Sequence, residues 1–179
     1  MRRYAIYFAP APDDPLGAFG NRWLGRDPWT GECLPQPRIP GLAPERLHAI
    51  TASPRRYGFH GTLKPPFALA PGATPADLDM AARTFAAARR PVEVPLALRS
   101  LSGFLALVPA EPVPALDALA ADCVRAFDSF RAPSDAAELS RRRAAGLTAR
   151  QDALLLAWGY PYVFEEFRFH LTLTERLGE

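Results

Sequence analysis

The sequence predicts an α+β domain, because segments with the two-residue alternation of strands and segments with helical periodicity share its 179 residues. A second observation is a histidine-containing motif that occurs twice, each time within a strand-like segment. A chain of this length fits one domain, which can be divided into two lobes that share a cleft. Strands are expected over residues 3–9, 57–64, 92–101, 104–108 and 164–174, and helices over 15–24, 43–49, 74–88, 113–131, 134–146 and 148–158.

Prolines delimit the elements of the first half. Residues 3–9 are aromatic and β-branched, and Pro10 ends this expected strand. Residues 10–52 form a long, turn-rich connection, and connections of this length often serve as lids or binding loops. The next strand-like segment, 57–64, alternates strictly and is expected to stop at Pro65.

Capping residues and turns delimit the second half. Thr74 before a proline is a typical helix N-cap, and the Ser-Gly pair at 102–103 predicts the turn of a hairpin. Thr148 with Gln151 forms a capping-box pattern for the last helix, and Gly159 is placed to end it.

The composition excludes several classes of protein. With 49% hydrophobic residues the chain can bury a core, and its net charge of +2 lacks the clustered cations of bulk nucleic-acid binding. The sequence contains no run of about 18 apolar residues, so it predicts no membrane span. The N-terminus is a poor secretory signal, so a cytoplasmic location is expected. The two cysteines, Cys33 and Cys123, have neither disulfide-framework nor zinc-site spacing.

The repeated motif carries the strongest functional signal. Residues 59–63 read Phe-His-Gly-Thr-Leu, and residues 169–173 read Phe-His-Leu-Thr-Leu. The chain has only three histidines, so two of them in five-residue motifs with four identical positions indicate an internal repeat, 110 residues apart. The third, His48, has no such motif and is interpreted as a surface or capping histidine.

The period of a strand divides each motif into an apolar and a polar face. The polar faces are expected to carry Arg56, His60, Thr62 and Lys64 in the first copy and Arg168, His170, Thr172 and Thr174 in the second. Each face therefore combines an imidazole, a hydroxyl and a cation. Lys64 is the single lysine among 21 basic residues, which favours a selected role for it.

This combination suits phosphate chemistry. Hydrolysis of a phosphodiester needs one group that takes a proton from the nucleophile and another that protonates the leaving oxygen. Histidine suits both roles because its pKa is near neutral. A hydroxyl can donate to a non-bridging phosphate oxygen, and a cation can stabilise charge on the phosphoryl group.

The paired His-x-Thr-Leu motifs resemble those of the two-histidine (2H) phosphoesterase superfamily, which includes RNA 2′,3′-cyclic phosphodiesterases and RNA 2′–5′ ligases. The resemblance implies a bilobal α+β fold, with two antiparallel sheets flanking a central cleft and helices outside. It implies that His60 and His170 are the acid/base pair and that Thr62 and Thr172 bind phosphate. It requires no metal, and no cofactor is expected.

Three stretches resemble an uncharacterised branch of that superfamily, encoded in bacterial phosphonate-utilisation operons. They are residues 3–7, 56–66 and 158–162, the last leading into the second motif. This resemblance implies a cyclic phosphodiesterase-like hydrolase whose substrate is a small phosphorylated molecule or an RNA end, with a place in phosphonate metabolism.

Other residues near the motifs are weaker candidates. Lys64 and Arg168 are candidate phosphate ligands, and structural or solvated roles are the alternatives. Candidates for the cleft lining are Tyr4, Tyr7, Arg56 and Tyr57, although aromatic residues on strands usually belong to the core.

Two other functions compete with the phosphoesterase. A non-catalytic phosphate- or RNA-binding module could retain the same fold, but binding alone would not require both imidazoles. The helix pair within residues 134–158, with three arginines at 141–143, resembles a helix-turn-helix, yet such helical hairpins are common and no DNA partner is expected.

The expected second lobe is short. We expect a first lobe over about 1–110 and a second over about 111–179, and the chain stops five residues past Thr174. A lobe matching the first would need another helix and two strands. The strand at 164–174 is expected to pair with the N-terminal region or with 104–108, and to leave an open edge. The sequence therefore predicts either an incomplete C-terminus or a homodimer that covers this edge.

Overall fold

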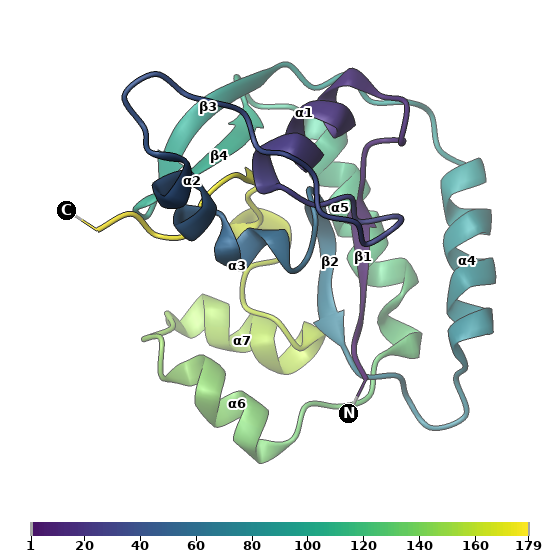
Figure 1. The fold of residues 1–179 in the computed structure, drawn as a ribbon. Coiled ribbons are helices and arrows are strands. Elements are labelled where there is room, and N and C mark those ends of the chain that lie inside the picture. The colour runs from purple at the N-terminus through teal and green to yellow at the C-terminus, as the bar shows by residue number, and fades with distance from the viewer. Residues whose placement is uncertain (1, 179) are drawn as a thin grey trace. The chain divides into compact units, whose positions relative to one another are not determined.

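The protein has an α+β fold in the computed structural model, which describes residues 2–178 (Figure 1). The strands are β1 (Tyr4–Phe8), β2 (Gly61–Phe67), β3 (Leu96–Leu101), β4 (Phe104–Pro109) and β5 (Leu171–Thr172). The helices are α1 (Pro15–Leu24), α2 (Pro44–Ile50), α3 (Ala52–Arg55), α4 (Pro75–Ala87), α5 (Pro114–Ala126), α6 (Ala136–Arg143) and α7 (Ala149–Trp158), with short 3-10 helices at Asp128–Phe130 and Phe164–Glu166. No helix within this part of the chain has the length and apolar character needed to cross a membrane.

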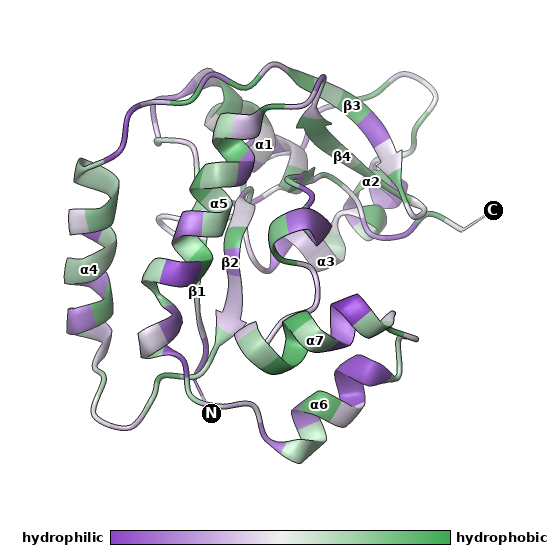
Figure 2. Cartoon of the chain, turned by 180° about the vertical axis from the view of Figure 1, so that it is seen from behind, coloured by the Kyte–Doolittle hydropathy of each residue, from purple (hydrophilic) through white to green (hydrophobic). Residues whose placement is uncertain are grey.

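The described strands form one sheet in the order β1-β2-β5-β4-β3. The pairings of β2 with β5, β5 with β4 and β4 with β3 are antiparallel. The expected pair of separate sheets is not confirmed, because β2 and β5, which carry the two motifs, are hydrogen-bonded neighbours. The hairpin of β3 and β4 is formed as predicted, and β4 is more hydrophobic along its length than β3 (Figure 2).

Two strand predictions need correction. The first motif strand does not stop before Pro65 but runs on through Pro65 and Pro66 to Phe67. Its pairing with β5 is at Gly61, so the prolines disrupt no bond to that neighbour. The second motif strand is confined to Leu171–Thr172, since residues 164–166 form a 3-10 helix instead.

The open edge expected at the second motif strand is not found. β5 pairs with β4 through Ala106 and Leu107, as predicted, and its other side pairs with β2. Both edges of β5 are therefore covered by strands of the same chain, and the reason for expecting a dimer at this strand does not apply.

The chain divides into two compact units, each built from three separate segments. Unit 1 comprises residues 1–6, 62–94 and 112–168, and unit 2 comprises 7–61, 95–111 and 169–179. These units do not coincide with the sequential lobes 1–110 and 111–179, because the chain passes from one unit to the other within β1 and within β2.

Unit 1 packs α4 and α5 side by side over a shared core (Figures 1 and 2). Phe67 of β2, Leu78 of α4 and Cys123 of α5 are buried together with Phe127. The predicted N-cap of α4 at Thr74 is present and forms a capping box with Asp77, and the predicted capping box of α7 at Thr148 is also present. A smaller cluster of Val124, Leu154 and Val163 packs α7 against α5.

Unit 2 is held together by close contacts of the motif phenylalanines with glycines. A Cβ atom at Gly20 of α1 would lie 2.1 Å from the ring of Phe59, and one at Gly61 would lie 2.4 Å from the ring of Phe169. The second contact explains the difference between the motifs, since Gly61 pairs with Leu171 and must leave room for Phe169. Both phenylalanines are buried.

Candidate active site

The pairing of β2 with β5 brings the two motifs together. Gly61 lies opposite Leu171 in an antiparallel register, so the register places His60 opposite Thr172 on the neighbouring strand. His170 directly precedes Leu171 and belongs to the same unit as His60. The charge of His170 contributes to the lowering of the pKa of His60, which agrees with their proximity.

His60 is fixed by its own turn and by an aromatic ring. Its Nδ1 lies 2.9 Å from the carbonyl oxygen of Gly58, which can only accept, so Nδ1 carries the proton and donates it. Gly58 has φ +79°, and a Cβ there would lie 2.6 Å from the side chain of Pro28, so this turn favours glycine twice over. The ring of Tyr7 lies over the imidazole, with 3.9 Å between ring centroids.

The surroundings of His60 favour its neutral form. Burial lowers its pKa below the ordinary value of 6.5, the hydrogen bond to Gly58 raises it, and the charge of His170 lowers it further. The net effect is a lowered pKa. In the neutral imidazole the lone pair is on Nε2, because Nδ1 donates to Gly58.

A pocket of about 330 Å³ opens beside His60 within unit 2. Its lining residues are Ser53, Pro54, Tyr57, Gly58, His60, Phe104, Thr172, Thr174, Glu175 and Arg176. Tyr57 is 65% exposed. The hydroxyl of Thr174, by contrast, is buried and accepts a hydrogen bond from the backbone N–H of Leu105, so it serves the fold.

Several lining residues were not identified from the sequence, and Phe104 and Arg176 are the two with chemistry of interest. Phe104 also contacts His170, with 5.7 Å between ring centroids, and it lies at the start of β4, which pairs with β5. Arg176 follows β5 and is exposed. The short separation of Arg176 from the second motif was the available signal, whereas nothing near Phe104 in sequence pointed to a site.

Lys64 does not line this pocket, in contrast to its expected place on the polar face beside His60. Its ammonium is 2% exposed and lies in unit 1, where it donates to the carbonyl oxygen of Val124 at 2.9 Å and to Asp128 at 3.2 Å. Burial lowers the pKa of Lys64, although the charge of Asp128 offsets part of that effect. These contacts indicate a structural cation.

Three other candidates also have different surroundings from those expected. Tyr4 packs against the core of unit 1, and Arg168, also in unit 1, donates to the carbonyl oxygens of Glu165 and Phe167. Arg56 is exposed and does not line the pocket beside His60. Thr62 is the first residue of unit 1 in β2, and its predicted role in phosphate binding stays a prediction.

His48 is exposed, as predicted, and lies in the last turn of α2, where it also takes part in a polar network. Arg55 lies 2.9 Å from His48 Nε2 and also donates to the carbonyl oxygen of His48. Gln36 Oε1 lies 3.3 Å from the other ring nitrogen. Since a guanidinium can only donate, His48 Nε2 accepts, and the histidine serves to hold α2 to α3.

Within residues 2–178, no three His, Cys, Asp or Glu side chains form a group that could hold a metal ion. The fold and the site thus define an α+β protein with two histidines beside neighbouring antiparallel strands. The chain belongs to the family described as "Protein of unknown function (DUF1045)", whose model matches residues 62–179.

Two curated relatives match almost the whole chain. A protein named "Ribose 1,5-bisphosphate phosphokinase PhnN" from Janthinobacterium sp. (strain Marseille) is 47% identical over 178 residues, which are 99% of this chain and 39% of that protein. A protein of the same name from Laribacter hongkongensis (strain HLHK9) is 38% identical over 177 residues, 99% of this chain and 41% of that protein. The chain therefore spans about two fifths of the length of these relatives. No solved structure matches it.

Proposed function

We propose that the chain is a phosphoesterase that opens a cyclic phosphate or cleaves a phosphodiester by two-histidine general acid/base catalysis. The observation that carries this proposal is the pairing of Gly61 with Leu171, which joins the two His-x-Thr motifs on neighbouring strands of one sheet. We further propose membership of the two-histidine phosphoesterase superfamily, in the branch linked to phosphonate utilisation.

In this mechanism His60 is the general base. The hydrogen bond to Gly58 holds its lone pair on Nε2, and its lowered pKa leaves it neutral near pH 7, which is the form that accepts a proton. His60 takes a proton from water while the water oxygen bonds to phosphorus. The bond from phosphorus to the leaving oxygen breaks, and protonated His170 supplies the proton to that oxygen.

The hydroxyl of Thr172 supports this assignment. It lies in the lining of the same pocket as His60, on the strand that pairs with Gly61. From there it can donate to a non-bridging oxygen of a bound phosphate, as charge builds up on the phosphoryl group. Thr62 would supply the corresponding donor from the first motif.

The names of the relatives favour a small phosphorylated sugar as substrate over an RNA end. Both are named for ribose 1,5-bisphosphate. Their phosphokinase activity is not part of this proposal. The P-loop signature of many kinases contains a Gly-Lys pair. The single lysine of this chain, Lys64, follows Leu63, so the chain lacks that signature. We propose that this activity belongs to the part of these relatives that the chain does not span.

Phosphorus NMR tests the proposal. Purified protein is incubated with a panel of cyclic phosphates on pentose, nucleotide and RNA-end scaffolds, with and without EDTA. We expect ring opening of at least one compound at a rate that chelation does not change. Binding without ring opening of any compound would favour a non-catalytic phosphate-binding module, and loss of activity in EDTA restored by one divalent metal would refute the metal-independent mechanism.

A further inference from the structure

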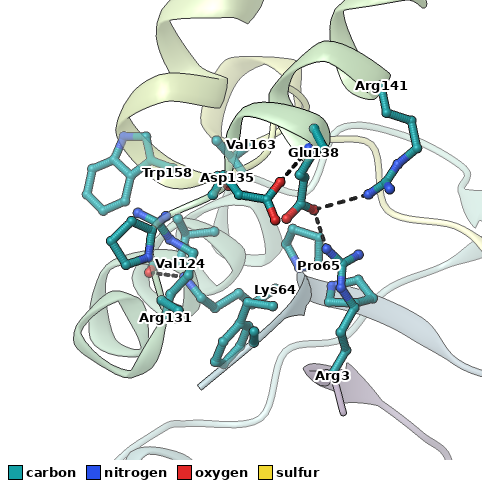
Figure 3. A pocket seen from close by; sticks show the side chains of 18 residues that line it. Arg3, Lys64, Pro65, Val124, Arg131, Asp135, Glu138, Arg141, Trp158 and Val163 are labelled. Atoms are coloured by element: carbon teal, nitrogen blue, oxygen red, sulfur yellow. Dashed lines mark hydrogen bonds and ion pairs between the residues drawn. The ribbon is translucent and has the colours of Figure 1, made fainter. Parts of the chain in front are cut away.

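Unit 1 contains a second cavity, of about 250 Å³, whose residues take no part in the proposed reaction (Figure 3). It is smaller than the roughly 300–1,000 Å³ of pockets for drug-sized ligands, so a small metabolite is the appropriate size. Its wall combines residues from four segments: Arg3 near β1, Lys64 of β2, Arg131 after α5, and Asp135, Glu138 and Arg141 at α6. Trp158, at the end of α7, adds an aromatic surface.

Glu138 is the centre of the charged cluster. Its Oε1 accepts a hydrogen bond from Arg3, and Arg141 lies 3.7 Å from the same oxygen (Figure 3). Arg142 donates to this oxygen as well, at 3.3 Å. Burial raises the pKa of Glu138, but hydrogen bonds and charges from Arg3 and Arg142 outweigh this, and its pKa lies below the ordinary value. Glu138 is thus an anion at neutral pH, and it is shared by three guanidinium groups.

The cluster has more positive than negative charge. Five cations, namely Arg3, Lys64, Arg131, Arg141 and Arg142, pair with two carboxylates, Asp128 and Glu138. A third carboxylate, Asp135, also lines the cavity. Lys64 and Arg131 pair with Asp128, whereas Arg3 and Arg141 both pair with Glu138, so Arg3 and Arg141 present two guanidinium groups around one carboxylate beside the cavity. Guanidinium groups bind phosphate in a bidentate manner, so this side of the cavity suits a phosphate.

The carboxylates indicate what else the ligand must offer. Among the hydrogen bonds within residues 2–178, none reaches Glu138 Oε2, and Asp135 uses one oxygen to accept from the backbone N–H of Glu138 at 2.7 Å. Oxygens of this kind accept from hydroxyl groups and repel a second anion. The side chain of Glu138 is 18% exposed and lines the cavity, so a ligand in the cavity can reach this carboxylate.

We propose that this cavity is a second ligand site, which binds a small phosphorylated polyol of the sugar-phosphate class. The phosphate lies against Arg3 and Arg141, the hydroxyls donate to Glu138 and Asp135, and the face of the sugar rests on Trp158. The proposal does not depend on the activity proposed for His60 and His170, because every residue it uses belongs to unit 1.

Calorimetric titration tests the site in the double variant His60→Ala, His170→Ala, in which the histidine site no longer competes for phosphate. Ribose 5-phosphate is the probe, with ribose and inorganic phosphate as its separate parts. We expect saturable binding of ribose 5-phosphate at least about tenfold tighter than that of either part. Backbone amide shifts in a nitrogen-15 NMR spectrum should move at residues 131–141.

Two variants and a control define the outcome. Arg3→Gln with Arg141→Gln should weaken ribose 5-phosphate binding about tenfold or more, and Glu138→Gln should reduce the preference for ribose 5-phosphate over inorganic phosphate. The matched control is Arg83→Gln, an exposed arginine of α4 paired with Asp79, which should leave binding unchanged. No saturable binding, equal affinity for inorganic phosphate, or shifts that avoid residues 131–141 would each overturn the proposal.

Discussion

Replacement of Gly61 with alanine should destabilise the protein, because the ring of Phe169 occupies the space that a side chain would need. The added Cβ would lie 2.4 Å from Cε2 and 2.5 Å from Cζ of Phe169, about 1 Å closer than ordinary van der Waals contact. Overpacking of this kind costs about 1–3 kcal/mol. For a chain of this length, that corresponds to a fall in Tm of roughly 2–12 °C.

Thermal unfolding followed by circular dichroism measures the effect, and a double-mutant cycle assigns its cause. Phe169→Leu removes the two ring atoms that the new Cβ would meet, so Gly61→Ala should cost less than half as much in that background. Gly178→Ala is the control, since a Cβ there meets nothing within 4 Å. An equal cost in both backgrounds, or a cost below about 0.5 kcal/mol in the wild type, would refute the described packing of β2 against β5.

Three further predictions follow from the same structure. Because the pKa of His60 is lowered in the folded protein, its contribution to stability should be complete above pH 6.5 and decline as the pH falls from 6.5 towards the pKa of the folded state. Chemical unfolding of wild type and His60→Gln between pH 5 and 8 measures this. A difference in the free energy of unfolding between the two proteins that does not change with pH would contradict it. Cys123 is buried and its pKa is raised to about 11, so a thiol reagent at pH 8 should label Cys33 alone until the protein is unfolded. Lys64→Met should lower the free energy of unfolding by roughly 1–3 kcal/mol and leave KM unchanged, whereas a raised KM would restore Lys64 as a substrate ligand.

The elements with local signals could be predicted from the sequence. The N-cap at Thr74, the capping box at Thr148 and the hairpin turn at 102–103 depend on residues within a few positions of one another, and all three are present. The helix expected over 113–131 ends earlier, at Ala126, and Phe127 reaches the core from the junction between α5 and the 3-10 helix Asp128–Phe130.

The errors concern contacts between residues far apart in the chain. The burial of Lys64 depends on Val124 and Asp128, at least 60 positions away, and the two-residue period alone placed it on the histidine face. The pairing of β2 with β5 joins positions 110 residues apart, so the motif repeat predicted two strands but not that they are neighbours in a single sheet.

The turnover of three histidine variants tests the central claim most directly. With the best cyclic phosphate from the panel, His60→Ala and His170→Ala should each lower kcat by roughly 10²–10⁴-fold, and each should lose one limb of the bell-shaped pH profile of the wild type. His48→Gln, at the histidine outside both motifs, is the matched control and should retain wild-type turnover. Wild-type turnover in either motif variant, or an equal loss in the control, would contradict a mechanism in which His60 and His170 transfer the protons.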